Sequence, residues 1–115
     1  MNSRTEAPHM AYGYLRVLSE VADRAAYAQE CDMKRFAEER GFQLVAIYHE
    51  FVCGALDAFN ELVEALSHTG ARHVVVPSLS HFGESGRLRD ALLDRLEFGV
   101  EARVYALDTS LVTGA

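Results

Sequence analysis

Four short runs rich in β-branched and aromatic residues alternate with three segments of helical periodicity along this chain of 115 residues. The β-rich runs cover residues 12–18, 42–48, 73–76 and 101–107. Such alternation predicts an α/β fold, because strands separated by helices are joined by right-handed crossovers that make the sheet mainly parallel. We therefore expect a three-layer sandwich, in which a mainly parallel sheet of four to five strands carries helices on both faces.

The predicted helices cover residues 20–40, 56–68 and 85–98. Apolar residues recur at helical spacing in the middle segment and give it one apolar face, namely Phe59, Leu62, Val63 and Leu66. A glycine stands just past each segment, at Gly41, Gly70 and Gly99, where helix C-caps favour it. Ser85 is placed to cap the amino end of the third helix.

The length of the chain fits one domain built around one core. We expect this domain to span residues 11–108, with residues 1–10 as a natural tail or cloning leader and residues 109–115 as a C-terminal tail. No apolar run approaches the roughly 20 residues that a membrane helix needs. The amino-terminal residues also lack the apolar core of a secretory signal. We therefore expect a cytoplasmic protein that makes no membrane contact.

The net charge of −6, from 17 acidic and 11 basic residues, bears on DNA binding. A domain that grips DNA by itself usually carries a basic face that neutralises phosphates. The third helix instead mixes its basic side chains with acidic ones, which predicts a solvated face with internal ion pairs. These residues are Arg87, Arg89 and Arg95 among Asp90, Asp94 and Glu97. We do not expect DNA binding by this chain alone.

Neither a metal nor an organic cofactor is expected from the motifs. Cys31 and Cys53 are far apart and form no C-x-x-C pair, and the five histidines show no metal-ligand spacing. The turn after the first β-rich run contains no glycine, so the sequence gives no sign of a phosphate-binding loop for a nucleotide.

Four segments are candidates for a catalytic or ligand-binding site, because open parallel sheets bind ligands at the carboxyl ends of their strands. They are Leu18-Ser19, residues 49–54, residues 77–84, and Asp108 onward. Arg16, inside the first β-rich run, has two open interpretations: it snorkels to water on the wetter side of the strand, or it faces an anion.

The third of these places groups Ser78, Ser80, His81 and Glu84, which invites the hypothesis of a hydrolase. The chain has no G-x-S-x-G nucleophile elbow, and closeness in sequence is not the geometry of a catalytic triad. We therefore favour a polar loop and helix capping as the interpretation of this group.

Four blocks of the sequence carry a resemblance to a known family. They are Tyr14-Leu-Arg-Val-Leu18, Gln29 with Phe36-Ala-Glu-Glu-Arg-Gly41, Tyr48-His-Glu-Phe-Val-Cys-Gly54, and Val75-Val-Pro-Ser-Leu-Ser-His-Phe-Gly-Glu84. In this order and spacing they resemble the catalytic domain of serine recombinases, the resolvase/invertase family, over residues 11–107. The resemblance implies a resolvase-like fold. It also implies a reaction in which a serine attacks a DNA phosphodiester to form a 5′-phosphoserine link, with clustered arginines stabilising the phosphate.

The residues that carry this reaction in the family are mostly replaced here. Leu18 stands at the nucleophile position, and Ser19, one residue on, would point to the opposite face of an extended strand. The family's Asp-Arg pair is Ser80-His81, and its second arginine is Glu84, which reverses the local charge.

Other family positions add to this picture. Cys53 stands for the serine of the Ser-Gly turn, while Arg16 and Gln29 keep family residue types. Arg16, Gln29 and His81 are the remaining candidates for anion binding. Family members continue into a long dimerising helix and a helix-turn-helix domain that reads DNA, and residues 108–115 are too short for either.

Three hypotheses follow. The leading one is a degenerate serine-recombinase-like domain without strand-exchange activity, acting as an interaction or regulatory module that binds a protein partner or a second copy. The alternative is a divergent DNA recombinase that forms the phosphoserine intermediate through Ser19, with Arg16 and His81 in support. The third is a sensor of a small ligand, in which Arg16 holds an anion near the strand ends.

Overall fold

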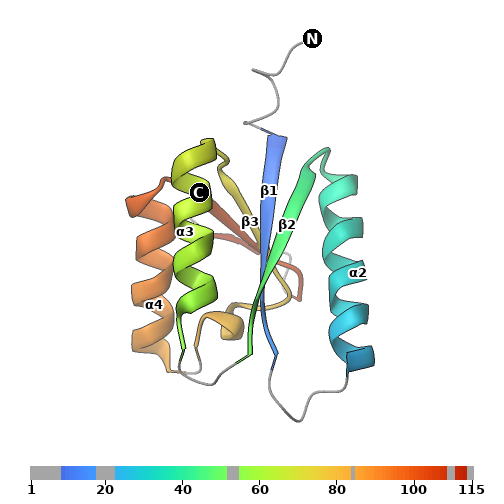
Figure 1. Ribbon diagram of the computed structural model, residues 1–115, viewed down its shortest axis with the longest axis horizontal. Coiled ribbons are helices and arrows are strands. Elements are labelled where there is room, and N and C mark those ends of the chain that lie inside the picture. The colour runs from blue at the N-terminus through green and yellow to red at the C-terminus, as the bar shows by residue number, and fades with distance from the viewer. Residues whose placement is uncertain (1–8, 18–22, 52–54, 84, 109–110, 114–115) are drawn as a thin grey trace.

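The computed structural model describes residues 9–17, 23–51, 55–83, 85–108 and 111–113, which form one sheet with helices on both faces (Figure 1). The strands are β1 (Met10–Arg16), β2 (Gln43–Glu50), β3 (His73–Val76), β4 (Arg103–Ala106) and β5 (Leu111–Thr113). Their order in the sheet is β2-β1-β3-β4-β5. The first four are parallel and β5 is antiparallel to β4. The expected mainly parallel α/β sheet is confirmed.

Among the described residues, three α-helices cover the two faces of the sheet. Helix α2 (Asp23–Glu39) lies on one face, and α3 (Asp57–Thr69) and α4 (Gly86–Asp94) lie together on the other (Figure 1). Two shorter helical segments complete the fold: the 3₁₀ turn η2 (Leu79–Phe82) and the π-helical turn η3 (Arg95–Gly99). Within the described ranges, no helix is long and apolar enough to cross a membrane.

Aromatic side chains dominate the larger of the two cores, between the sheet and α3 and α4. Tyr14 stacks on Phe82 with ring centroids 5.4 Å apart, and Phe59 meets both rings edge-on. All three side chains are fully buried. Offset and edge-to-face packing of this kind adds about 0.5–1.5 kcal/mol per pair beyond the burial of apolar area. The aromatic cluster therefore fixes η2, which carries Phe82, against β1 and α3.

A β-bulge at Val45 lets Leu44 and Ala46, which would share a face of a regular strand, pack into different cores. Ala11 pairs with Leu44 whereas Tyr12 pairs with Ala46, so Val45 is an extra residue on β2. One extra residue shifts the alternation of side chains between the faces. Leu44 accordingly packs on the α2 side and Ala46 on the α3 side, and Val45 itself is 43% exposed.

Three of the predicted capping residues lie at helix ends in the structure. Gly41 and Gly70 both adopt φ 78°, and the Gly70 N–H donates to the carbonyl oxygen of Leu66. The Ser85 side chain accepts the N–H of Leu88 at 3.1 Å, which confirms it as the N-cap of α4. These three residues end or begin their helices as the sequence predicts.

The predicted third helix over residues 85–98 is present as an unbroken helical stretch from Gly86 to Gly99, but its last turn is not α-helical as expected. The α-helix ends at Asp94 and the chain continues as the π-turn η3. The wider turn buries Leu96, whose carbonyl accepts the N–H of Ala102 at 2.7 Å. Burial of Leu96 under the connection to β4 thus outweighs regular α-helical geometry.

The expected ion pairs along this helix are also wrong for two arginines. Arg89 donates to the carbonyl oxygen of Gly83 at 3.4 Å. Arg95 donates to Asn60 of α3 at 3.1 Å and lies 5.1 Å from the centre of the Phe59 ring. Arg89 thus links α4 to the end of η2, and Arg95 links η3 to α3.

Two strands differ from what the sequence predicts. Strand β1 ends at Arg16, two residues before the predicted end, and Leu18 lies outside the described residues. Residues 111–113, predicted as part of a C-terminal tail, form β5 and pair with β4. An antiparallel edge strand of three residues is too short to give a periodic sequence pattern, which is why it was not expected.

Replacing Gly83 with alanine should destabilise the domain by about 1–3 kcal/mol. Gly83 has φ 135°, which L-residues rarely adopt, and an added Cβ would lie 2.8 Å from Cδ2 of Leu88. Gly99→Ala is the matched control, since no atom lies within 4 Å of the added Cβ. Urea unfolding measures both variants, and equal midpoints for the two would contradict the expectation.

Candidate functional site

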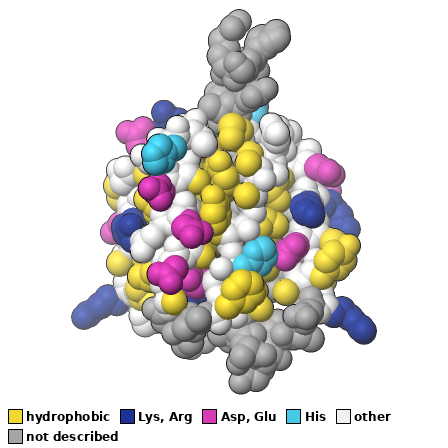
Figure 2. All heavy atoms as spheres, in the orientation of Figure 1, with side chains coloured by type: hydrophobic (Ala, Val, Ile, Leu, Met, Phe, Trp, Pro, Cys, Tyr) yellow, Lys and Arg dark blue, Asp and Glu magenta, His cyan; other side chains and the backbone are white. Residues whose placement is uncertain are grey.

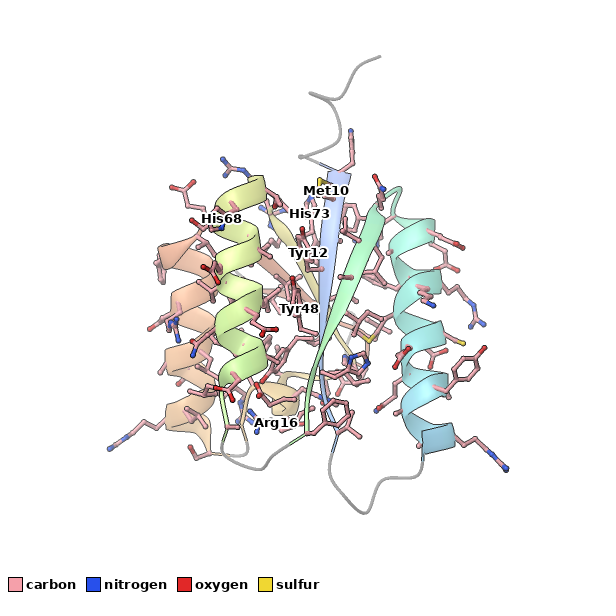
Figure 3. The ribbon with its side chains drawn as sticks, in the orientation of Figure 1. Met10, Tyr12, Arg16, Tyr48, His68 and His73 are labelled. Carbon is pink, nitrogen blue, oxygen red and sulfur yellow. The ribbon has the colours of Figure 1, made fainter. Side chains whose placement is uncertain are left out.

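The carboxyl ends of β1, β2 and β3 meet at one edge of the sheet, as the sequence predicts. Arg16 and Glu50 are direct partners in the register of β1 and β2, and η2 follows β3 across Pro77. Figure 3 shows Arg16 at this edge, at the far end of β1 from Met10. Beside it the N–H of Asp108 donates to the carbonyl oxygen of Pro77 at 3.0 Å, so the end of β4 joins the same edge.

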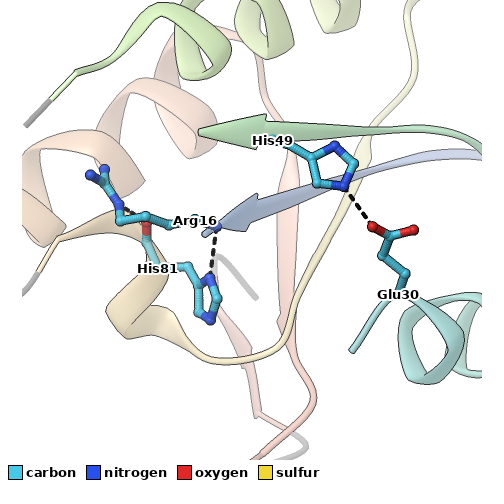
Figure 4. A network of polar contacts seen from close by, with 4 residues as sticks. All are labelled: Arg16, Glu30, His49 and His81. Atoms are coloured by element: carbon cyan, nitrogen blue, oxygen red, sulfur yellow. Dashed lines mark hydrogen bonds and ion pairs between the residues drawn. The ribbon is translucent and has the colours of Figure 1, made fainter. Parts of the chain in front are cut away.

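Arg16 and His81 are bonded to each other twice (Figure 4). The backbone N–H of Arg16 donates to Nδ1 of His81 at 2.9 Å, and Nε of Arg16 donates to the carbonyl oxygen of His81 at 3.0 Å. Nη2 also lies 3.4 Å from the Tyr14 hydroxyl oxygen. The half-buried Arg16 therefore joins the end of β1 to η2. The two interpretations of Arg16, solvated or anion-facing, both stay predictions.

His81 is a neutral acceptor in this arrangement. Its Nδ1 receives an N–H, so this atom carries no proton and the neutral ring carries its hydrogen on Nε2. Burial lowers the pKa of His81 and the Arg16 guanidinium lowers it further, while Asp108 acts in the opposite direction. The imidazole is thus uncharged at neutral pH and supplies no positive charge to this edge.

Glu50 is a buried carboxylate at the same edge. It is 3% exposed and accepts three hydrogen bonds: from the Tyr14 hydroxyl at 2.9 Å, from the N–H of Ala58 at 3.1 Å and from the N–H of Phe59 at 3.2 Å. The last two donors belong to the first turn of α3, whose N-cap residue, Leu56, makes no side-chain cap. Glu50 of β2 therefore caps α3, where a negative charge is favoured by the helix dipole.

Tyr14 lies between Arg16 and Glu50. Burial raises the pKa of its phenol well above the usual range, and the hydrogen bond to Glu50 raises it further. The hydroxyl is consequently a fixed donor to the carboxylate, because the phenolate would be both desolvated and repelled.

Gln29 does not join this group. It lines a depression of about 300 Å³ farther along the same edge, between α2 and the ends of β3 and β4, together with Asp32, Pro77, Leu107 and Asp108. Two carboxylates beside its amide disfavour a bound anion. The expected set of Arg16, Gln29 and His81 is therefore brought together only in part, and Gln29 is a poor candidate for anion binding.

The hydroxyl groups after β3 bond to each other rather than to His81. Ser78 Oγ and Ser80 Oγ lie 2.6 Å apart on an exposed turn. His81 Nδ1 is used by Arg16, so the described residues contain no Ser-His pairing through that atom. This supports the interpretation of the segment as a polar loop. Within the described ranges, no three His, Cys, Asp or Glu side chains are grouped to hold a metal ion.

Comparison with known proteins decides the family. Residues 11–113 match the family model described as the resolvase N-terminal domain. The chain belongs to this family of resolvase N-terminal domains. A search of curated proteins found no significant match.

Two solved structures have the same fold as this resolvase-family domain. The N-terminal catalytic domain of TP901-1 integrase matches with a TM-score of 0.75 and 20% identity, over 92% of this chain and 82% of that chain. A resolvase-family site-specific recombinase from Streptococcus pneumoniae matches with a TM-score of 0.75 and 21% identity, over 90% of this chain and 75% of that chain. At such identities the likeness concerns the fold.

Several positions of the family motif fall outside the described residues: Leu18, Ser19, Cys53 and Glu84. Among the described ones, the structure adds two that the sequence did not single out, Tyr14 and Glu50. The available signal was the resolvase-family motif itself, in which Glu50 stands at an acidic position two residues after Tyr48. A second signal is the position of Glu50, an acidic residue that ends an apolar strand shortly before a helix begins. A negative charge there can be stabilised by the amino end of that helix.

Removing the Glu50 carboxylate should cost about 2–4 kcal/mol of folding stability, because buried donors on Tyr14, Ala58 and Phe59 lose their acceptor. Glu50→Ala is compared by urea unfolding with Glu61→Ala, an exposed glutamate of α3. Comparable losses in the two variants would contradict the capping role.

His81→Asn should flatten the pH dependence of stability in mildly acidic solution. Asparagine Oδ1 can accept the Arg16 N–H but does not titrate. Because the native pKa of His81 is lowered, the unfolded chain binds more protons between that pKa and the unfolded value of about 6.5. His81 therefore contributes fully above about pH 6.5, and its contribution falls as the pH drops through the native pKa. Urea unfolding of both proteins from pH 7.5 to about 5 measures this, and parallel curves would contradict it.

Proposed function

We propose that this chain is a resolvase-family domain that does not catalyse DNA strand exchange and that acts by binding a protein. The main support is the state of Arg16, the arginine that keeps its family residue type. Its Nε is bonded to the carbonyl oxygen of His81 and its Nη2 faces the Tyr14 hydroxyl. A phosphate would have to replace contacts that also fix β1 to η2. The arginine is used to hold the fold.

The electrostatics of the edge support the same proposal. Phosphoryl transfer needs fixed positive charge where negative charge develops in the transition state. Here His81 is neutral at neutral pH, the buried acidic side chain of Glu50 lies at the same edge, and Asp108 lies close enough to act on His81. The net charge of −6 adds a long-range repulsion of DNA.

The residues at the family's reactive positions also support it. Leucine, at position 18, has no nucleophilic atom, and glutamate at position 84 replaces a cation by an anion. Together with Arg16, these residues argue against the two other hypotheses. A divergent recombinase would need Ser19 as nucleophile near a cationic cluster, and an anion sensor would need Arg16 to be accessible.

A covalent-adduct assay tests the proposal directly. The full chain is incubated at low salt, where phosphate contacts are strongest, with a pool of duplex DNA of random sequence, and protein–DNA adducts are sought on denaturing gels. We expect no adduct from the native chain, from Ser19→Ala, or from Leu18→Ser, because restoring a hydroxyl does not restore the cationic cluster.

A serine-linked product of the native chain that disappears in Ser19→Ala would overturn the proposal in favour of a divergent recombinase. An adduct formed only by Leu18→Ser would show that the phosphate site has survived, which would overturn the account of Arg16. An active serine recombinase in parallel serves as the positive control.

A further inference from the structure

The sheet is open along β2. It ends at β2, and in the part of the chain that the structure describes no strand lies beyond it. Figure 1 shows β2 in front, between α2 and α3, with neither helix crossing over it. We propose that this edge binds an extended segment of a partner protein that carries lysine or arginine side chains and adds to the sheet as a further strand. The inference rests on the proposed function and names the class of partner.

The backbone of β2 is suited to strand addition. The carbonyl of Glu50 faces β1, because it accepts the N–H of Val17 at 2.8 Å. Backbone groups alternate in direction along a strand, so the N–H and C=O groups of Ile47 and His49 point away from β1. The pairing with β1 is regular from Ala46 to Glu50. Residues 43–50 contain neither lysine nor proline, the residues that commonly protect a sheet edge.

Exposed apolar groups lie beside this edge. Phe51 is 65% exposed and Tyr27 is 67% exposed, and the Phe51 ring stacks on His49 with centroids 5.8 Å apart. Both line a depression of about 270 Å³ between α2 and the end of β2. Large exposed aromatic side chains beside an open strand give an incoming strand apolar surface to cover, in addition to backbone hydrogen bonds.

Carboxylates border the edge on both sides. On the α2 side, Glu30 Oε2 lies 2.8 Å from His49 Nε2. Glu38 and Lys34 line a depression that also includes Gln43, the first residue of β2. On the α3 side, Glu61 is near Tyr48, whose phenol pKa is raised by burial, then by Tyr12 and Glu61. Figure 2 shows hydrophobic side chains along the middle of this face, mostly acidic ones on the α3 side, and both acidic and basic ones on the α2 side, so the excess of negative charge lies over α3. Complementary charge on the partner is therefore positive.

The same charges disfavour a second copy of this chain as the occupant. Antiparallel pairing of two β2 edges about a twofold axis would place the two α3 helices side by side on one face of the joined sheet. The carboxylates of Glu61 and its neighbours would then face each other, between chains that each carry a net charge of −6. Like charges across an interface oppose association, whereas a basic strand is attracted to it.

A peptide selection tests the partner class. Peptides of about nine random residues are displayed and selected for binding to the full chain. We expect selected peptides to be enriched in lysine or arginine alternating with β-branched residues. The best peptide should bind Glu61→Lys about tenfold more weakly than native protein, since the charge beside the edge is reversed. Asp90→Lys, the same charge change at an exposed position of α4, should leave affinity unchanged.

Amide hydrogen exchange with the best peptide bound locates the contact. Strand addition predicts new protection at the amides of Ile47 and His49, and loss of binding in Val45→Lys, which puts a charge at an exposed position of the edge. The inference would be overturned if the selection yields no peptide or yields peptides without a preference for basic residues. It would also be overturned if the amides of Ile47 and His49 stay unprotected when the peptide is bound. Dimerisation of the native chain that Val45→Lys abolishes would replace the proposed partner by a second copy. DNA cleavage in the adduct assay would overturn the proposed function without altering these readouts.

Discussion

The arrangement of this domain depends on one buried carboxylate. Glu50 lies on β2, receives the hydroxyl of Tyr14 from β1, and receives two backbone N–H groups from the first turn of α3. Moving an ion out of water costs several kcal/mol, so the burial of Glu50 is tolerated only because each of these donors is in place. The carboxylate thereby fixes where α3 begins relative to the sheet. It also sets the position of Tyr14 and, through the register of β1 and β2, that of Arg16.

The second constraint builds on the first. Arg16 holds η2 through a backbone and a side-chain hydrogen bond to His81, and Phe82, one residue on, fills the aromatic core. Open α/β sheets bind their ligands at the carboxyl ends of the strands. At this edge Arg16 bonds to neutral groups of His81 and Tyr14, and Glu50 caps a helix. Arg16, which is of a residue type that could hold a phosphate, instead stabilises the position of η2. The packing of the domain and its proposed lack of strand exchange therefore depend on the same contact.

Much of the fold could be predicted from local patterns, and the site only in part. The β-branched run at residues 73–76, the glycine at position 70 and the capping Ser85 each act within a few residues of themselves, so the sequence reveals them. The bond between Arg16 and His81 joins residues 65 positions apart, and no periodicity predicts it.

The bulge at Val45 and the π-turn after Asp94 were missed for a related reason. Each is a local irregularity that depends on packing against elements far away in the sequence. The bulge, for example, lets Leu44 and Ala46 pack into different cores. Glu50 belongs to a family motif in the sequence, but its capping role cannot be predicted from the sequence. The cap of α3 comes from a residue of β2, whereas a cap is usually supplied by the residue just before the helix.

The bond from Nε of Arg16 to the His81 carbonyl oxygen is the contact on which the proposed loss of strand exchange most depends. The most direct measurement follows the Nε–H signal of Arg16 by nuclear magnetic resonance while inorganic phosphate, and then short duplex DNA, is added at low salt. We expect a slowly exchanging Nε–H, protected by the His81 carbonyl, whose resonance does not move with either addition. A saturable shift of that resonance, with loss of its protection, would show instead that the guanidinium leaves His81 for a phosphate and would contradict the proposal.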